Sequence, residues 1–455
     1  MASLSGSISI ALRGLVAQQT ALETSTNNIA NSNTPGYARR RAVMMEDAPS
    51  FDGNVMVPRG VSVQSIESLR DRVLELRIQQ ETQQQSGTES YLSSMSGVDS
   101  IFSDTTSGID SKLNALFSSL ERLSTQPSDA ALRQSVLTAA SNLASSFRDT
   151  AQKLQSTKSN LEISVKQSVG EINELLKQVA DVNVMVANKQ AIGQDAGAFE
   201  DQRTLLLRKL SEQMDVQVVQ TESGITVTAG NGAPLVVGGT AYELSTAVDS
   251  ASGTNHVFSG TDDITAEISG GQLGGTLRAR ASIADLVGDI DELAAGVVSA
   301  FNAAHRAGFN ADGITGADLF TTCGTTQGAA SSMQLLISDP TAIAASADGT
   351  AGSNGNIATL LAVRNTAVVG SETPIDCYSR IAFKVGSSIS NAQSDATAGS
   401  VILQQLDDQR GAVSGVSMDE EAANLIRFQR AYEAAARVIN TINQLLDTAV
   451  NLGRA

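Results

Sequence analysis

The chain has 455 residues, which is long enough for roughly two to four domains. It carries 31 Lys and Arg against 48 Asp and Glu, a net charge of −17. Phosphate backbones repel so acidic a chain, which argues against nucleic acid as a partner. No apolar run approaches the ~18 residues that cross a bilayer. The first residues also lack the basic start and the small-residue cleavage site of a signal peptide. We therefore expect neither membrane insertion nor a cleaved leader.

Aromatic residues make up only 4% of the chain, and apolar residues 41%, with many small aliphatic side chains. Such side chains suit long, thin helical packing better than one large globular core. The two cysteines, Cys323 and Cys377, are too few for a disulfide framework. They either pair with each other or remain two free, small apolar residues.

An amphipathic helix is predicted over residues 4–30. Apolar residues recur in it every seven positions, at Ile8, Leu15, Leu22 and Ile29. The residue before Pro35 is disfavoured in helical conformation, and Gly36 permits a turn, so the helix should end before them. Residues 46–65, with several Pro and Gly, are predicted to be irregular.

Two long helices are predicted next. One covers about 68–102, and the other follows Pro127, with Ser128 as its N-cap, and runs to about Lys189. The second half of the latter has a heptad pattern typical of a coiled coil, at Leu161, Val165, Ser168, Ile172, Leu175, Val179, Val182 and Val186.

The pattern changes near Met214, where short runs of Val, Ile and Leu alternate with Gly-containing turns. This predicts β-hairpins to about Leu277, and it makes the glycines of Gly270–Gly275 turn residues. A helix is expected over 282–307, followed by loops and short elements over 308–355.

Two helices are predicted to return the chain, over 378–409 and 418–452. The last has apolar residues alternately three and four apart, at Leu425, Phe428, Tyr432, Ala435, Ile439, Ile442, Leu446 and Ala449. Both ends of the chain thus carry apolar seams, with no internal partner that is large enough to cover them. We predict that another subunit covers them.

Two terminal motifs resemble those of a known family. Asn27–Arg39, which reads NNIANSNTPGYAR, resembles the N-terminal signature of flagellar rod, hook and hook-associated proteins, and Ser417–Tyr432 resembles their C-terminal signature. Interior segments are similar to the first hook-associated proteins, the FlgK family: Gln126–Asp129 with Arg133 and Gln134, Asp201–Arg203, Gly270–Gly275, His305–Phe309 and Ser338–Ser346.

The resemblance implies a structural subunit of the bacterial flagellum, not an enzyme, which sits outside the cell at the hook–filament junction and is needed for filament assembly. It implies type III export without a cleaved signal peptide. The implied partners are further copies in a ring or helical oligomer, the hook protein, a second hook-associated junction protein, and an export chaperone on the C-terminal helix. Subunit contacts are expected at Ile8, Leu15, Leu22, Ile29, Asn31, Thr34, Pro35, Gly36, Tyr37, Leu425, Phe428, Tyr432, Ile439, Ile442 and Leu446.

The expected fold is mainly α with a β-rich insert. A long antiparallel helical bundle would be built from both termini, with a β-rich outer domain in the middle. We expect an inner terminal-helix domain from 1–60 with 414–455, a helical bundle domain from 61–190 with 356–413, and a β-rich outer domain over 191–355.

Three alternatives are less favoured. Flagellin is disfavoured by the turn at Pro35, and a hook subunit by the long central heptad. A secreted surface-binding module would need aromatic or Arg anchors on the β-rich insert, but residues 214–280 contain only Tyr242 and Phe258 as aromatics.

An enzyme has little support in the motifs. The two histidines, His256 and His305, have no neighbours at metal-ligand spacing, and the chain has no nucleophile elbow, phosphate loop or dinucleotide fingerprint. Asn310–Gly313 lacks the remaining ligands of a calcium loop and is interpreted as a turn. No metal or cofactor is expected. The arginines 39–41 are interpreted as a solvated basic patch, or alternatively as partners of acidic groups on a neighbouring subunit.

Overall fold

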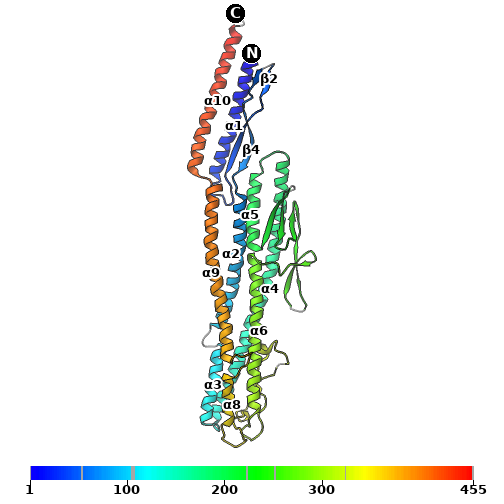
Figure 1. Ribbon diagram of the computed structural model, residues 1–455, viewed down its shortest axis with the longest axis vertical. Coiled ribbons are helices and arrows are strands. Elements are labelled where there is room, and N and C mark those ends of the chain that lie inside the picture. The colour runs from blue at the N-terminus through cyan, green and yellow to red at the C-terminus, as the bar shows by residue number, and fades with distance from the viewer. Residues whose placement is uncertain are drawn as a thin grey trace.

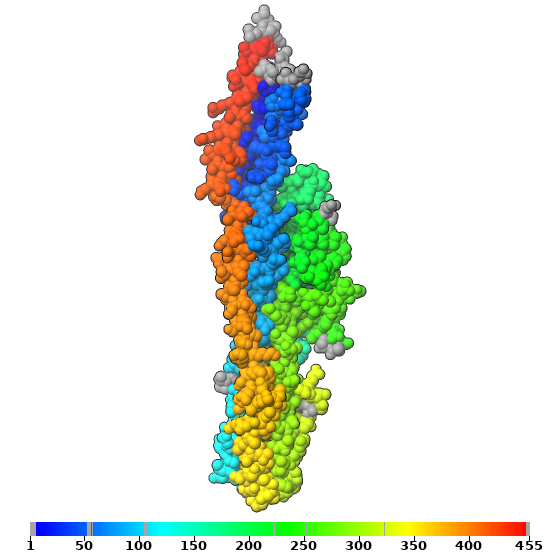
Figure 2. All heavy atoms as spheres, in the orientation of Figure 1, coloured from blue at the N-terminus to red at the C-terminus, as the bar shows by residue number. Residues whose placement is uncertain are grey.

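A computed structural model describes residues 2–52, 55–103, 108–221, 224–250, 253–322 and 324–452 of the protein. The molecule is long and narrow, and the chain runs out from one end and returns, so that both termini lie at the same end (Figure 1). Figure 2 shows the β-rich segment projecting from one side of this rod. The predicted class, mainly α with a β-rich middle, is confirmed.

The terminal helices α1 (Ala2–Ala30) and α10 (Met418–Leu452) lie side by side and antiparallel (Figure 1). Both helices have nearly the bounds that the sequence predicts. Ala11, Ala17 and Ala21 on α1 are buried, and such small side chains let neighbouring elements approach this helix closely. The two apolar seams therefore cover each other within one chain, at least in part.

Residues 46–65 are not irregular, and that prediction was wrong. The structure has two antiparallel strand pairs in and around this segment: β1 (Arg40–Glu46) with β4 (Val61–Ser68), and β2 (Ser50–Asp52) with β3 (Val55–Val57). Gly60, with φ +92°, lies in the turn just before β4. Strand pairing and contact with α1, which no local pattern records, hold these residues extended.

The helical bundle contains α2 (Arg72–Phe102), α3 (Ile109–Thr125), α4 (Ala130–Ala191), α6 (Gly271–Arg306) and α9 (Pro374–Ser414). Three of these were predicted with similar bounds, whereas α3 was not predicted and α6 begins earlier than expected. Its core contains fully buried aromatic rings, among them Phe117 and Phe301, which stack with centroids 5.8 Å apart.

The N-cap of α4 is Asp129 and not Ser128. The Asp129 carboxylate accepts hydrogen bonds from the backbone N–H groups of Ala131 (2.7 Å) and Leu132 (3.0 Å). Asp and Ser are comparable caps, and the backbone here enters the helix one residue later than predicted.

The glycines of Gly270–Gly275 do not form a β-turn, and that interpretation was wrong. They begin α6, which crosses α2 so closely that a Cβ at Gly275 would lie 2.1 Å from the carbonyl oxygen of Gly87. Glycine is needed for helix contact at this point, which a sequence pattern does not distinguish from a turn.

The β-rich segment follows α5 (Gly197–Gln213), a helix that the sequence did not predict. A four-stranded antiparallel sheet has the order β5 (Val216–Thr221), β6 (Gly224–Ala229), β7 (Pro234–Val237), β8 (Thr240–Ala241). A three-stranded sheet has the order β11 (Asp262–Asp263), β10 (Asn255–Ser259), β9 (Leu244–Val248). The predicted β-hairpins are thereby confirmed, and their buried residues share one core with the second half of α4 and with α5.

Residues 308–355 are mostly loops, as predicted, with the short α7 (Ala329–Ser332) and the 3-10 turn η1 (Pro340–Ala342). The chain then forms α8 (Gly355–Ala362) and η2 (Val363–Asn365). The predicted turn at Asn310 is confirmed, because its Oδ1 accepts hydrogen bonds from the N–H groups of Asp312 and Ile314, both 2.9 Å.

The expected three-domain division stays a prediction. The named strands of the β-rich segment occupy only 216–263, and α6, which the expected boundaries assigned to the β-rich domain, packs along α2 and α4 in the bundle. Cys377 is buried with a free thiol, while Cys323 lies outside the described residues.

Candidate assembly interface

The N-terminal motif forms a hydrogen-bonded turn between α1 and β1. The buried side chain of Asn28 donates through Nδ2 to the carbonyl of Arg40 (2.8 Å) and accepts through Oδ1 from the N–H of Arg40 (3.0 Å) and the hydroxyl of Tyr37 (2.7 Å). Gly36, at φ +81°, supplies the left-handed residue that reverses the chain. Burial raises the pKa of Tyr37 above its already high ordinary value, so its hydroxyl is a donor at neutral pH and well above it.

The remaining motif residues divide between the turn and the surface. Asn31 donates to Oδ1 of Asn27 (2.9 Å) and accepts from the Thr34 hydroxyl (3.1 Å). Thr34 and Pro35 are exposed. The motif therefore stabilises its own fold and leaves a small outer surface.

Arg39 connects this turn to the returning chain. Its Nε donates to Oε1 of Glu421 (2.8 Å), its Nη1 donates to Oε2 of Glu420 (2.6 Å), and its backbone N–H donates to the carbonyl of Ser414 (2.9 Å). The Glu421 side chain is 2% exposed and that of Glu420 62%. The buried pair thus joins the N-terminal turn to the first turn of α10.

Arg40 connects the same turn to α5. It donates to one carboxylate oxygen of Asp201 (2.8 Å), while Arg70 pairs with the other oxygen and also donates to the hydroxyl of Thr204 (2.7 Å). Burial raises the pKa of Asp201 above its usual range, against the two guanidinium groups, which lower it.

We call these six residues the junction cluster: Arg39, Arg40, Arg70, Asp201, Glu420 and Glu421. The interpretation of arginines 39–41 as a solvated patch was wrong for Arg39 and Arg40, whose acidic partners lie in the same chain, whereas Arg41 is exposed. The cluster holds the α1–α10 pair against the end of the bundle.

The predicted seam residues of α1 and α10 are mostly half-buried. Half-buried positions are Ile8, Leu15, Leu22, Ile29, Leu425, Phe428, Ile439 and Leu446. Ile442 is buried, and Tyr432 is 36% exposed. Their assignment to contacts between subunits stays a prediction.

Other apolar residues on the two helices are about half exposed to solvent, on more than one side of α10, and we call them together the outer face: Leu12, Val16, Ile426, Val438 and Leu445. Leu12 and Val16 lie one turn apart and are each 53% exposed. Sequence reasoning missed this set because its members stand beside the heptad seam, where an isolated apolar residue carries no periodic signal.

The two histidines each have hydrogen-bonding partners within the chain. His305 is buried, its Nδ1 lies 2.6 Å from the carbonyl of Ala317, and its Nε2 accepts from the N–H of Ala344 (3.0 Å). Nδ1 of His256 lies 2.6 Å from Asp263, and hydrogen bonds lower the pKa of that carboxyl to about 2 against a desolvation effect that raises it. In the described ranges, no group of three or more His, Cys, Asp or Glu side chains is arranged to hold a metal ion.

Comparisons with known proteins place these elements. Residues 95–320 match the family described as flagellar hook-associated protein FlgK helical domain, residues 8–37 the flagella basal body rod protein family, and residues 409–452 the C-terminal family of flagellar basal body rod FlgEFG proteins. Flagellar hook-associated protein 1 of Bacillus subtilis is 30% identical, with 97% of each chain covered. That of Salmonella typhimurium is 26% identical, with 99% of this chain and 100% of the relative covered.

The chain belongs to the flagellar hook-associated protein 1 family, FlgK. It is a structural protein of the flagellar hook–filament junction. Its fold is similar to that of the flagellar hook junction protein FlgK from Burkholderia pseudomallei, with a TM-score of 0.66 and 16% identity over 74% of this chain and 100% of the other.

The two terminal matches of this FlgK-family chain coincide with its terminal helices. The rod-type segment 8–37 contains most of α1, and the segment 409–452 contains all of α10. The junction cluster begins just after the first of these segments. Among the described helices, none is both long and apolar enough to cross a membrane.

Proposed function

We propose that this protein joins hook to filament through the α1–α10 pair, whose outer face packs against neighbouring copies and against hook subunits. The observation that carries the proposal is the exposure of Leu12, Val16, Ile426 and Leu445, each more than half open to solvent on long helices. Burying a Val or Leu side chain contributes about 1.5–3 kcal/mol, so several such contacts support a stable subunit interface.

The proposed partners beyond further copies are the hook protein and a second hook-associated junction protein. Before export, a chaperone would cover α10, which carries Ile426, Val438 and Leu445 in the open. Export would proceed without a cleaved signal peptide. The role is assembly without catalysis, which agrees with a family of structural proteins.

Immunogold electron microscopy of the native organism tests the location, with an antibody against residues 216–263. The expected result is a narrow band where the hook meets the filament. Label along the whole filament would indicate a flagellin and label on the curved hook a hook subunit. Absence of label from every flagellum, with the epitope shown to be accessible, would refute the proposal.

Charge insertion tests the interface. Leu12→Glu and Leu445→Glu should abolish stable filament attachment and leave the unfolding temperature of the purified chain almost unchanged, because both side chains are already solvated. Ile163→Glu on α4, at a site that is 57% exposed and outside the outer face, is the matched control and should retain attachment. Normal attachment with both outer-face variants would show that the outer face is not the interface.

A further inference from the structure

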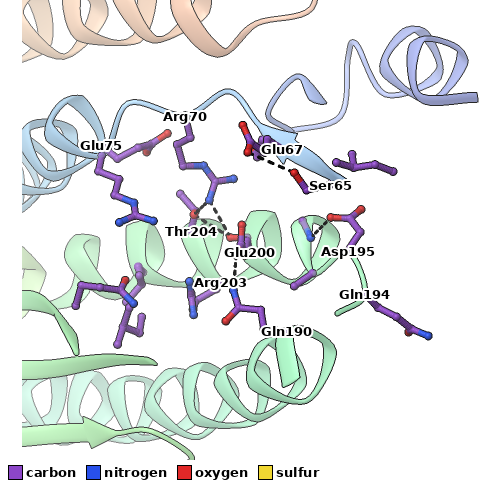
Figure 3. Close-up of a pocket in the computed structure, with 18 of the residues that line it drawn as sticks. Ser65, Glu67, Arg70, Glu75, Gln190, Gln194, Asp195, Glu200, Arg203 and Thr204 are labelled. Carbon is purple, nitrogen blue, oxygen red and sulfur yellow. Dashed lines mark hydrogen bonds between the residues drawn. The ribbon is translucent and has the colours of Figure 1, made fainter. Parts of the chain in front are cut away.

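A cleft of about 710 Å³ lies where the terminal part of the molecule meets the bundle. Its walls come from β4, the start of α2, the turn between α4 and α5, α5 itself and β5. Figure 3 shows Ser65 and Glu67 of β4 on one side of this cleft and Arg203 of α5 on the other. The volume falls within the ~300–1,000 Å³ that is usual for binding pockets.

Arg203 is a cation in this cleft without a carboxylate partner. Within the described part of the chain it forms no ion pair, and its guanidinium donates only to Oδ1 of Asn183, at 3.3 Å. Burial is the main effect that lowers the pKa of Arg203; the charge of Glu200 raises this pKa, and the charges of Arg70 and Arg72 lower it. The nearby Glu200 accepts instead from Gln190 (3.0 Å). A guanidinium that has lost part of its hydration and forms no ion pair is energetically costly, and a carboxylate in the cleft would offset that cost.

The other charged groups that line the cleft either have partners or, like Glu67 and Arg72, are exposed to solvent. Arg70 pairs with Asp201 in the junction cluster, and Glu75 accepts from Arg410 (2.8 Å). Arg203 is therefore the half-buried cation of this cleft that an additional acidic group would complement best.

The shape of the cleft favours an extended occupant. All of residues 63–68 of β4 line it, and in the described sheets β4 pairs only with β1. The second edge of β4 therefore presents backbone N–H and C=O groups that an added strand can bind. Val218 and Gln220 also line the cleft, and they belong to β5, the outer strand of its sheet.

We propose that the cleft receives an extended, carboxylate-bearing segment of a second copy of this protein. The carboxylate would pair with Arg203 and the backbone would follow the free edge of β4. The charge of the chain favours a second copy, because 48 acidic residues against 31 basic ones leave each copy with unpaired carboxylates to offer. The inference rests on the proposed function, in which copies are neighbours at the junction.

Zero-length crosslinking of the full chain in isolated hook–filament preparations tests this contact. Arg203→Lys keeps the positive charge and supplies an amine. A water-soluble carbodiimide activates a carboxylate that touches the amine, an amide bond forms, and the carbodiimide leaves as a urea with the oxygen of the carboxylate. Cells co-express the Arg203→Lys chain and an epitope-tagged chain that retains Arg203.

The expected result is a crosslinked dimer of the tagged and untagged chains, with Lys at position 203 joined to an Asp or Glu of the tagged copy by mass spectrometry. The dimer should be absent from purified monomer. Arg208→Lys on the same helix is the matched control, because Arg208 pairs with Asp407 (2.9 Å) and its Lys variant should crosslink within one chain. A crosslink from position 203 to another flagellar protein, one to Glu200 only, or no crosslink overturns the inference.

A second variant separates docking from a structural role. Arg203→Gln should leave the unfolding temperature of the purified chain unchanged or higher, because it removes a desolvated charge, and should reduce retention of the chain on isolated hooks. A lower unfolding temperature with normal retention would mean that Arg203 only supports its own fold. If immunogold places the Arg203→Lys chain at the junction but no dimer forms, this inference fails and the proposed function stands. If the unaltered chain is absent from the junction, the proposed function itself fails.

Discussion

Substituting Gly275 with Ala should destabilise the helical bundle, although alanine is the better helix former. Gly275 on α6 faces Gly87 on α2, and an added Cβ would lie 2.1 Å from the Gly87 carbonyl oxygen and 2.8 Å from Cβ of Ser90. The first contact is with backbone, so a side-chain rotation cannot relieve it. The two helices must separate locally.

The magnitude follows from three contributions. Overpacking of a tight contact costs about 1–3 kcal/mol, and the upper end applies because backbone must move. Separation also weakens the hydrogen bond from the Ser90 hydroxyl to the Gln272 carbonyl (2.9 Å), a loss of about 1 kcal/mol. Replacing Gly by Ala in a helix returns about 1 kcal/mol. The expected net loss of stability for Gly275→Ala is about 2–3 kcal/mol.

Gly288 is the matched control on the same helix, because a Cβ there meets nothing within 4 Å. Gly288→Ala should stabilise by up to about 1 kcal/mol through helix propensity alone. Urea unfolding followed by circular dichroism should therefore move the bundle midpoint in opposite directions for the two variants, with similar slopes. An unchanged or raised midpoint for Gly275→Ala would refute the close-contact explanation of this glycine.

Three further outcomes are expected. Asn28→Ala should destabilise the chain by about 2–3 kcal/mol and lower its unfolding temperature, because three hydrogen bonds of a buried side chain are lost. Asn27→Ala, at an exposed position in the same motif, should change the unfolding temperature much less. Glu421→Gln should lower the stability of the chain by about 3 kcal/mol and release it from isolated hook–filament preparations at a lower temperature. Glu420→Gln should lower the stability by only ~0–1 kcal/mol, since only the Glu421 carboxylate is buried. Equal effects of the two substitutions would contradict this explanation. Burial lowers the pKa of His305 from 6.5, so as the pH falls this imidazole is protonated in the unfolded chain before it is protonated in the folded chain. The stability that neutral, buried His305 contributes is therefore complete above about pH 6.5 and is lost below it. The difference in unfolding temperature between wild type and His305→Gln should shrink from about pH 7.5 to about pH 5.

Long periodic elements could be predicted because their signal is local. The helices at both ends, the long helix up to residue 191 and the β-hairpins after Met214 each repeat their apolar residues many times within one element. The strands at 40–46 and 61–68 could not be predicted in the same way, since each is half of a pairing and is interrupted nearby by Pro and Gly.

The candidate site shows the same difference. The motif around Pro35 and Tyr37 correctly predicted a turn. The contacts that hold this turn in place are made by Asn28 and by carboxylates that lie far along the chain. Glu421 is 382 residues from Arg39, and Asp201 is 161 residues from Arg40. No spacing rule connects such positions, so the arginines looked like solvated charges.

The terminal helices, the β-rich middle and the family could be inferred from the sequence, because amphipathic periodicity and the two terminal motifs are properties of consecutive residues. The three-dimensional arrangement was needed to show that the two seams partly cover each other, that a different outer face stays open, and that Arg203 lies half-buried in a cleft without an ion pair. Those properties depend on which surfaces meet in space, and burial of a charge or an apolar side chain is decided by neighbours that are distant in the chain.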